Sequence, residues 1–402
     1  MRFLTAGESH GKGLTTIVEG FPSNIKVEKE IIDFHLARRQ MGYGRGGRMK
    51  IEKDKAEILS GIRFQKTLGS PISLWIENKD WANWIEKMDP EGKVPINEKI
   101  TLPRPGHADL VGVSKYNLPD IRNSIERSSA RETAARVAAG SIARIYLEYF
   151  GITIGSFVES IGGVYSKNSD EINSLFDNNL PKDFDAWKLS ERTDLSSVRV
   201  FDQDHEDRIV RKIKSAKKKG DTLGGTFITV VSGLPVGLGS FVHYDTKLDA
   251  DLAHTIMSIN AVKGVEIGTG FKSADSYGSE SHDIITLEES TFSRGSNRAG
   301  GIEGGISTGL PIIIRGAMKP IATLMSPINA VDLSTMEAAE SRRERSDFVA
   351  VPACAVIAES MVAWTIAEHI IKKFGGDSIE EALDNYKLYN KKLFARIKKN
   401  FK

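Results

Sequence analysis

The chain has 402 residues, of which 40% are hydrophobic and 27% are charged, a composition typical of a globular protein with a sizeable core. Its 55 basic and 53 acidic residues leave a net charge of only +2, which argues against a protein built mainly to bind nucleic acid or an anionic membrane. The single cysteine, Cys354, excludes an intrachain disulfide and argues against a cysteine-ligated metal site.

Strand-like and helix-like patterns follow one another along the chain without a regular alternation. The first half predicts a helix over residues 27–40, strands at EILSGIRF and SPISLWIE, an Ala-rich helical pattern over 120–150 and a strand at ITIGSFVESI. The second half predicts strands at GTFITVVSG, DIITL and LPIIIRGAM, a helix over 333–343 and an almost wholly apolar, buried helix over 353–373. This order favours an α+β fold with mostly antiparallel sheet over a doubly wound nucleotide-binding fold.

No linker or internal repeat divides the chain, so we expect a single domain over residues 1–402 with long inserted glycine-rich loops. The N-terminal segment MRFLTAGESHGKG lacks the apolar run of a signal peptide. We also expect no stretch to reach the ~20 apolar residues of a membrane span. The expected location is the cytoplasm.

The 37 glycines gather in short clusters such as GESHGKG, MGYGRGGR and AGGIEGGISTG, which are typical of sharp turns and of backbone that approaches a ligand closely. Many arginines accompany these clusters. Because guanidinium binds phosphate and carboxylate bidentately, the set favours a ligand with several anionic groups, with surface salt bridges as the alternative. The set comprises Arg38, Arg39, Arg45, Arg48, Arg104, Arg122, Arg127, Arg131, Arg342, Arg343 and Arg345.

Two histidines and one aspartate are candidates for proton transfer. His10 and His107 occur in the polar, glycine-containing segments GESHGKG and RPGHADL, and imidazole titrates near neutral pH. Asp347 follows Glu344-Arg345-Ser346, where a helix cap or an ion pair is the alternative. A solvated or purely structural role is the alternative for each histidine. Ser129 and its neighbours precede the Ala-rich helix, so they could bind phosphate or simply cap that helix.

The common nucleotide-binding and hydrolase signatures are absent from the sequence. GESHGKG is too short for a phosphate loop, and GxGxxG at a strand–helix junction, HExxH and GxSxG do not occur. Instead, the chain resembles the chorismate synthase family along almost its whole length. The segments that carry this resemblance, in chain order, are GESHG with EGFP, GYGRGGRMKIE, RPGHADL, RSSARET, SINAVKGVEIG, NRAGGIEGGISTG, MKPIATL and RSD with ESM.

The resemblance implies a 1,4-anti elimination in which 5-enolpyruvylshikimate 3-phosphate loses phosphate from C3 and a proton from C6 to give chorismate, the last step of the shikimate pathway to aromatic amino acids. It implies a requirement for reduced FMN without net redox change, because transient electron donation from the flavin can help to break the allylic C–O bond. It further implies the family fold, a β-α-β sandwich with helices packed between antiparallel sheets, and a homotetramer.

Residue by residue, the resemblance implies His107 as the proton donor to the departing phosphate, His10 near flavin N1 and Asp347 as a base toward flavin N5. It implies no metal. The residues that it implies for binding substrate or NADP are Arg39, Arg45, Arg48 and Arg131. The residues that it implies for binding FMN are Ser129, Ala130, Arg131, Asn260, Ala261, Gly304, Lys319, Pro320, Ile321, Ala322, Thr323 and Arg345.

Two alternative functions stay open at this point. The first is an NAD(P)H-dependent flavin oxidoreductase on the same fold, since some family members reduce their own flavin with NADPH while others depend on an external flavin reductase. The second is nucleic-acid binding, suggested by GRGGR and by the tail KKLFARIKKNFK. The near-neutral charge balance argues against the second, and the tail is more simply an amphipathic terminal helix.

Overall fold

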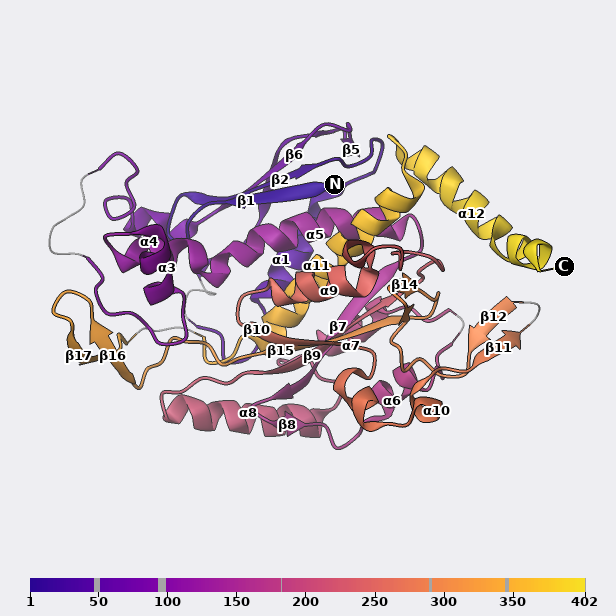
Figure 1. Ribbon diagram of the computed structural model, residues 1–402. Helices are drawn as coiled ribbons and strands as arrows, with labels where there is room; N and C mark the ends of the chain where they lie inside the picture. The colour runs from indigo at the N-terminus through magenta and orange to yellow at the C-terminus, as the bar shows by residue number, and fades with distance from the viewer. Residues whose placement is uncertain (47–50, 93–98, 182, 289–290, 344–346, 402) are drawn as a thin grey trace.

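In the computed structural model, two antiparallel sheets enclose a layer of helices (Figure 1). The structure describes residues 1–46, 51–92, 99–181, 183–288, 291–343 and 347–401. Helices packed between antiparallel sheets are the arrangement that the α+β sandwich prediction requires, so the predicted fold class is confirmed.

The first sheet has four strands, in the order β1-β2-β6-β3, with every neighbouring pair antiparallel. Along β2, Leu14, Thr16 and Val18 are buried while the residues between them are more exposed, so one face of the sheet turns toward the helices. The strands are β1 (Arg2–Ala6), β2 (Gly13–Glu19), β3 (Ala56–Ser60) and β6 (Ile72–Glu77).

The second sheet has five antiparallel strands, in the order β10-β15-β9-β7-β8. Its central strands are buried on both faces, because the helix layer covers one face and α6 and α7 cover the other through Leu175 and Leu189. The strands are β7 (Thr153–Ile161), β8 (Val164–Tyr165), β9 (Gly225–Ser232), β10 (Val262–Ile267) and β15 (Ile312–Met318).

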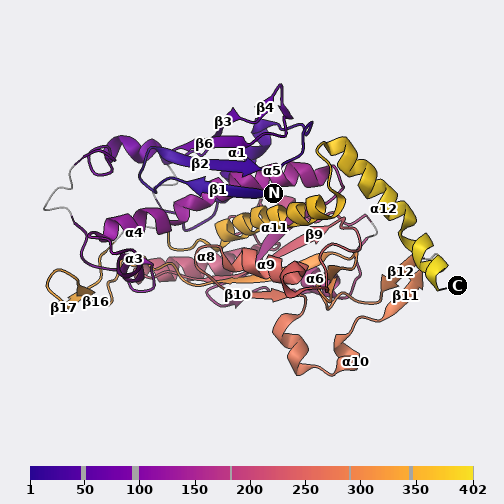
Figure 2. The ribbon, with the colours of Figure 1, turned by 45° about the horizontal axis from the view of Figure 1, so that its top comes forward.

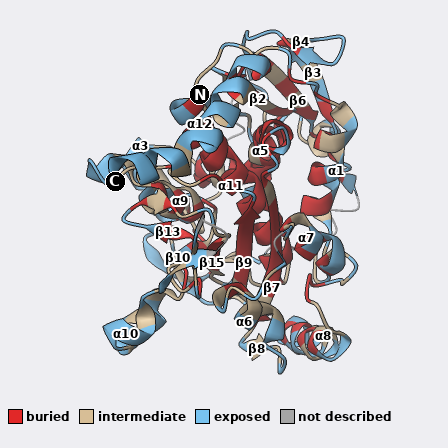
Figure 3. Cartoon of the chain, turned by 90° about the vertical axis from the view of Figure 1, so that its right-hand side faces the viewer, coloured by how far each residue is buried: buried red, intermediate tan, exposed pale blue. Residues whose placement is uncertain are grey.

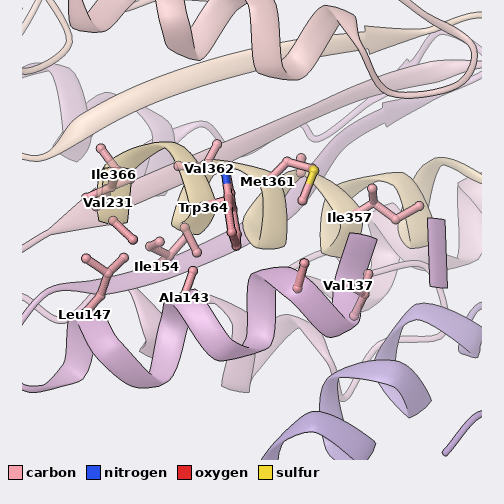
Figure 4. Packing of buried hydrophobic residues seen from close by; sticks show 14 of the residues in the cluster. Val137, Ala143, Leu147, Ile154, Val231, Ile357, Met361, Val362, Trp364 and Ile366 are labelled. Atoms are coloured by element: carbon pink, nitrogen blue, oxygen red, sulfur yellow. The ribbon is translucent and has the colours of Figure 1, made fainter. Parts of the chain in front are cut away.

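The helix layer between the sheets contains α1 (Lys29–Gln40), α5 (Thr133–Glu148), α9 (Leu248–Met257) and α11 (Val351–Phe374). Helices α5 and α11 pack directly on each other in the core (Figure 4). A Cβ atom on Gly140 would lie 2.4 Å from the backbone oxygen of Ser360, so this close approach of the helices requires glycine. This small residue of the Ala-rich pattern therefore allows the close contact between the two helices.

The remaining elements surround this core. The helix α12 extends away from the body of the protein, and α10 also projects from this body (Figure 2). The helices outside the central layer are α3 (Asp109–Tyr116), α4 (Ile121–Ser128), α6 (Asp170–Phe176), α7 (Trp187–Thr193), α8 (Gln203–Lys218), α10 (Gly278–Ser281) and α12 (Ile379–Asn400). Short 3-10 turns cover Lys79–Asn83, Ala130–Glu132, Tyr244–Thr246 and Gly270–Asp275. Two-stranded pairs form from β4 (Ile62–Arg63) and β5 (Lys66–Thr67), β11 (Ile285–Glu288) and β12 (Thr291–Arg294), β13 (Ile302–Glu303) and β14 (Ile306–Ser307), and β16 (Asn329–Asp332) and β17 (Glu337–Glu340).

The helix predicted over 333–343 is wrong, because this segment forms the turn and second strand of the β16–β17 hairpin. The Asp332 side chain accepts hydrogen bonds from both the backbone nitrogen and the hydroxyl of Ser334, which fixes a turn in place of a helix start. Met336 then adopts a left-handed conformation with φ of 57°, which ends the turn and begins the return strand.

The QDHED segment forms the first turn of α8. Asp202 caps this helix by accepting from the backbone nitrogen of His205, and the ring of His205 is buried with Nε2 3.0 Å from the carbonyl oxygen of Val164. Residues 391–400 of the basic tail form the last part of α12, so the helix predicted for this tail is confirmed.

Among the described residues one helix, α11, is long and apolar enough to cross a membrane by length and composition alone, because its 24 residues include an apolar window of 18 residues. The expectation that no stretch reaches this length therefore needs correction. However, 89% of that window is buried inside the protein, where α11 lies at the centre of the core (Figure 3). The predicted helix over 353–373, buried nearly all round, is confirmed.

Candidate active site

His10 lies in the loop between β1 and β2, where the carboxylate of Glu126 on α4 holds it. Glu126 Oε1 is 2.9 Å from the ring Nδ1 of His10, and Oε2 accepts the backbone N–H of His10 at 2.7 Å. The imidazole stacks on Trp84 with ring centroids 4.0 Å apart, and Arg122 lies against the same indole. Burial raises the pKa of Glu126, but the hydrogen bond and charge of His10, with the charge of Arg122, lower this pKa more, so it lies below the usual range.

His107 has an analogous partner in Asp109, the first residue of α3. The two residues approach to 2.5 Å between Nδ1 and Oδ1, and the Asp109 side chain is fully buried. Arg104 donates to the same carboxylate from Nε at 2.8 Å, from Nη2 at 3.0 Å and from its backbone nitrogen at 2.9 Å. Burial raises the pKa of Asp109, but the hydrogen bonds from His107 and Arg104 lower it well below its usual range, so the carboxylate is ionised at neutral pH.

Asp54 holds Arg39 and Arg131 together in the interior. Asp54 Oδ2 accepts from Arg39 Nη2 at 2.7 Å and Oδ1 accepts from Arg131 Nη1 at 2.6 Å, and at most 4% of any of these three side chains is exposed. Arg131 Nε also donates to Asn78, whose amide in turn donates to the backbone oxygen of Gly11. The structure thus brings two predicted substrate-binding arginines together beside the loop that carries His10.

Arg45 and Asp347 form a second pair within the predicted site, from segments far apart in the sequence. Asp347 Oδ2 is 3.0 Å from Arg45 Nη1, and Oδ1 accepts the backbone N–H of Gly46 at 2.5 Å. Asp347 therefore takes part in the ion pair that was the alternative to a catalytic role, and this pairing leaves its catalytic role untested. Arg48 and Arg345 lie outside the described residues.

The first part of the predicted FMN set lies beside the His10 loop. Ser129 begins the turn before α5, accepts from the backbone nitrogen of Arg131 and donates to the hydroxyl of Ser9 at 3.1 Å. Asn260 donates from Nδ2 to the backbone oxygen of Ser128 at 3.1 Å, which connects the segment after α9 to the same turn. Asn260 Oδ1 is buried and has no hydrogen-bond partner among the residues that the structure describes.

The second part of this set leads on to His107. The backbone nitrogen of Lys319 donates to the carbonyl oxygen of Ala261 at 2.9 Å, and the Lys319 ammonium donates to the carbonyl oxygen of Gly106. Ala322 also lies against Gly106, because a Cβ added there would be 3.8 Å from that of Ala322. A continuous series of direct contacts therefore connects the His10 loop, through Asn260 and Lys319, to the His107 loop.

Other members of the predicted FMN set occupy different places. Ile321, between Pro320 and Ala322, accepts a hydrogen bond from Thr222 at its backbone oxygen, and Thr323 is buried. Gly304 lies in the turn between β13 and β14, where the next residue accepts the backbone N–H of Leu248 at the start of α9. Asn260 follows the other end of this 10-residue helix, roughly 15 Å away, so the chain does not bring Gly304 and Asn260 together.

Arg38, a member of the predicted anion-binding set, contacts a buried carboxylate instead. Arg38 joins Arg144 and Arg199 around the fully buried carboxylate of Glu359 on α11, at distances of 2.7, 2.9 and 3.0 Å. Ser156 also donates to this carboxylate at 2.6 Å, so the cluster ties α1, α5 and α11 to the second sheet. Burial raises the pKa of Glu359, but these guanidinium charges lower it well below its usual range.

Two cavities of about 190 and 390 Å³ lie elsewhere on the surface. The smaller is lined by residues such as Asp194 and Arg199, and the larger by residues such as His282 and Arg298. Neither cavity is lined by His10, His107 or Asp347, so the predicted proton-transfer residues lie outside both cavities.

Comparison with known proteins identifies the family. The family model described as chorismate synthase matches residues 1–371. The chain belongs to the chorismate synthase family. It is 51% identical to a chorismate synthase from Chlorobium phaeobacteroides (strain BS1), with 100% of this chain and 99% of the relative covered. It is 53% identical to a chorismate synthase from Chloroherpeton thalassium, with 96% and 98% covered. A solved crystal structure of a chorismate synthase superposes with a TM-score of 0.79 at 40% identity, covering 98% of each chain.

Sequence reasoning about the chorismate synthase motifs missed the three carboxylates that hold the site together. Asp109 lies two residues after His107, so the His-Ala-Asp spacing was a usable signal. Glu126 and Asp54 carried no such signal, because Glu126 meets a histidine 116 positions away and Asp54 joins two arginines that are themselves far apart. Trp84, which stacks on His10, was missed for the same reason.

Proposed function

We propose that this chain catalyses the 1,4-anti elimination of phosphate from 5-enolpyruvylshikimate 3-phosphate to give chorismate, the last step of the shikimate pathway to aromatic amino acids. The observation that carries the proposal is the series of contacts that connects the His10 loop to the His107 loop. Each of these histidines is held by a buried carboxylate, and the chain belongs to the chorismate synthase family. A site with two oriented imidazoles and several arginines suits a multiply anionic substrate that must lose phosphate and a proton.

Each residue has a chemical task in this proposal. His107, as imidazolium, donates a proton to the departing phosphate, and the ionised carboxylate of Asp109 stabilises its charge. Asp347 accepts the proton that the substrate loses from C6. Arg39, Arg45 and Arg131 bind anionic groups; in the described structure each already faces a carboxylate, which keeps the guanidinium groups oriented until a ligand competes for them. Arg48 has the same expected role.

The residues present fit a flavin. Asn260 Oδ1 is a buried acceptor without a partner among the described residues, so a ligand N–H would satisfy it. A Cβ on Gly304 would meet nothing within 4 Å, which leaves open space at that turn. Ser129, Ala130, Asn260, Ala261 and Lys319 would hold the cofactor, with Arg345 and the segment 320–323. Reduced FMN, when bound, supplies the transient electron density that eases loss of an allylic phosphate.

Assembly and location complete the proposal. The enzyme acts in the cytoplasm as a homotetramer, and reduced FMN comes from an external flavin reductase. The alternative is that the chain reduces its own flavin with NADPH, with Arg39 and Arg45 serving the nucleotide. The placement of Gly304 at the far end of α9 from Asn260 is compatible with a second copy approaching that end. Sedimentation of the purified protein tests the tetramer, and NADPH consumption with FMN and no other protein tests the alternative.

The deciding experiment mixes purified protein anaerobically with dithionite-reduced FMN and 5-enolpyruvylshikimate 3-phosphate and follows chorismate absorbance and released phosphate. We expect equal amounts of both products with reduced FMN and none with oxidised FMN. His10→Ala, His107→Ala and Asp347→Ala should each lower turnover by about 10²–10⁴ without unfolding the protein. Absence of product from folded, FMN-binding protein would reject the proposed reaction, and an unchanged rate in one variant would remove that residue from the mechanism.

A further inference from the structure

The two histidines of the proposed mechanism share one arrangement in the structure. Each ring meets a buried carboxylate through the same atom, Nδ1: Glu126 at 2.9 Å from His10 and Asp109 at 2.5 Å from His107. The side chains of Glu126 and Asp109 are 1% and 0% exposed, so neither carboxylate is in contact with bulk solvent. A carboxylate oxygen only accepts hydrogen bonds when ionised, and therefore Nδ1 must carry the proton in both contacts.

Glu126 fixes the position of His10 as well as its protonation. One of its oxygens takes the backbone N–H of His10, and its own carbonyl oxygen accepts the backbone N–H of Ser9 at 3.0 Å. The stacked Trp84 limits rotation of the ring from the other side. In the part of the chain that the structure describes, the charged groups around this imidazole are Glu126 and Arg122 from α4, with Lys87 on the indole of Trp84.

Asp109 plays the matching part for His107. Arg104 supplies three donors to Asp109, which hold the carboxylate in one orientation. Arg104 Nη2 is also 3.1 Å from Nδ1 and 3.5 Å from Nε2 of His107, whereas Asp109 Oδ1 is closer, at 2.5 Å from Nδ1, so we assign the Nδ1 proton to the contact with the carboxylate. Among the described residues, the charged groups around His107 are Asp109, Arg104 and the Lys319 ammonium on the neighbouring carbonyl of Gly106.

We propose that Glu126 and Asp109 are positioning residues that hold His10 and His107 as the Nδ1-protonated tautomers, so that Nε2 of each ring is the atom that exchanges protons with the bound ligand. The inference rests on the proposed function for its catalytic consequence, whereas the tautomers themselves are a property of the protein alone. The same logic operates in hydrolase triads, where a carboxylate on Nδ1 orients the histidine without reacting itself.

The tautomers can be measured directly by solid-state ¹⁵N NMR on protein labelled only at its 8 histidines, with signals assigned through His10→Ala and His107→Ala. We expect both residues to be protonated at Nδ1 above pH 8. The chain contains an internal reference for the opposite tautomer, because His205 Nε2 faces a backbone carbonyl, which can only accept. Finding His10 or His107 protonated at Nε2 like His205 would overturn the proposal for that residue.

The catalytic consequence is tested with Glu126→Gln and Asp109→Asn, which keep shape and remove charge. We expect kcat to fall by about 10² or more with little change in KM, because the ring loses its fixed orientation and its counter-charge. The pH profile of kcat is recorded for both variants, because loss of the counter-charge beside the ring should change it whereas a purely structural defect should not. The matched control is Asp251→Asn, which removes the carboxylate 2.9 Å from the buried His369 outside the site and should leave kcat and the pH profile unchanged.

The outcomes separate this inference from the proposed function. Wild-type protein that shows the expected tautomers but forms no chorismate would reject the function and leave the positioning of the rings standing. Wild-type protein that forms chorismate while Glu126→Gln and Asp109→Asn keep wild-type kcat, tautomers and pH profile would reject the positioning roles. If Asp109→Asn does not fold, the wild-type tautomer of His107 and the Glu126→Gln variant still decide the matter.

Discussion

Replacing Asp54 by Asn should destabilise the protein strongly, because Asp54 is the main counter-charge for two buried guanidinium groups. The side chains of Arg39 and Arg131 are 4% and 3% exposed, and their only other carboxylate among the described residues is Glu52, 3.9 Å from Arg131. In the wild-type protein the two guanidinium groups face the carboxylates of Asp54 and Glu52. After the substitution they face only that of Glu52 among the described residues. Breaking a buried ion pair from one side costs about 3–5 kcal/mol, and we expect the Asp54→Asn variant to lose that amount of unfolding free energy.

Urea unfolding of both proteins measures this loss, with Glu19→Gln as the control, since its partner Arg2 is 68% exposed and the pair should contribute less than about 1 kcal/mol. Inorganic phosphate should restore part of the stability of Asp54→Asn by binding the two released guanidinium groups, about 2.7 kcal/mol at a hundred times its Kd. A variant within about 1 kcal/mol of wild type would refute the reasoning. A large loss that phosphate does not reduce would confirm the ion pair and reject anion binding by this pair of arginines.

Three further predictions concern the core, the pH dependence and the substrate. Gly140→Ala should cost about 1–3 kcal/mol by urea unfolding, because the new Cβ would lie 2.4 Å from Ser360 O, whereas Gly264→Ala, whose Cβ would meet its neighbour at 3.4 Å, should cost less than about 1 kcal/mol; equal costs would contradict this. Burial, followed by the charges of nearby arginines, holds the pKa of His35 well below its usual range, so below about pH 6.5 the unfolded chain takes up a proton that the folded protein does not. As pH falls below about 6.5, the free energy of unfolding should therefore decrease by up to about 1.4 kcal/mol per pH unit more in wild type than in His35→Gln. Equal slopes in the two proteins would show that His35 does not have a lowered pKa in the folded protein. Arg45→Ala should mainly raise KM for 5-enolpyruvylshikimate 3-phosphate, and unchanged KM and kcat would remove Arg45 from substrate binding.

The layers of the fold were predictable because burial leaves a strong local pattern. The apolar run over 353–373 and the β-branched runs at 152–161, 225–233 and 310–318 each form the element expected, since these segments are buried on nearly every side. The error at 333–343 has the opposite cause. That segment is mostly exposed, so turn chemistry at Asp332, rather than packing, decides its structure.

The site was predictable only in part, for a related reason. Residues such as His10, His107 and Arg131 stand in segments whose composition or family resemblance marks them, whereas Glu126 and Asp54 are ordinary acidic residues until the fold brings them to their partners. Their roles depend on contacts across more than a hundred positions or between several segments, and no local pattern encodes such a contact. The predicted single domain and the individual ligand contacts stay predictions.

The position of α11 in the chain has a consequence for synthesis on the ribosome. This helix fills the centre of the molecule and is the direct neighbour of α5, yet it ends at Phe374, whereas α5 ends at Glu148. At about 5–20 residues per second, roughly 10 to 45 s separate the emergence of the two helices. Throughout that interval the side of α5 that packs on α11 lacks its partner, and the strands β7 and β9 of the second sheet lack it once they have emerged. The nascent chain must therefore keep a large apolar surface from aggregating, which makes it a natural client for chaperones that bind before translation ends.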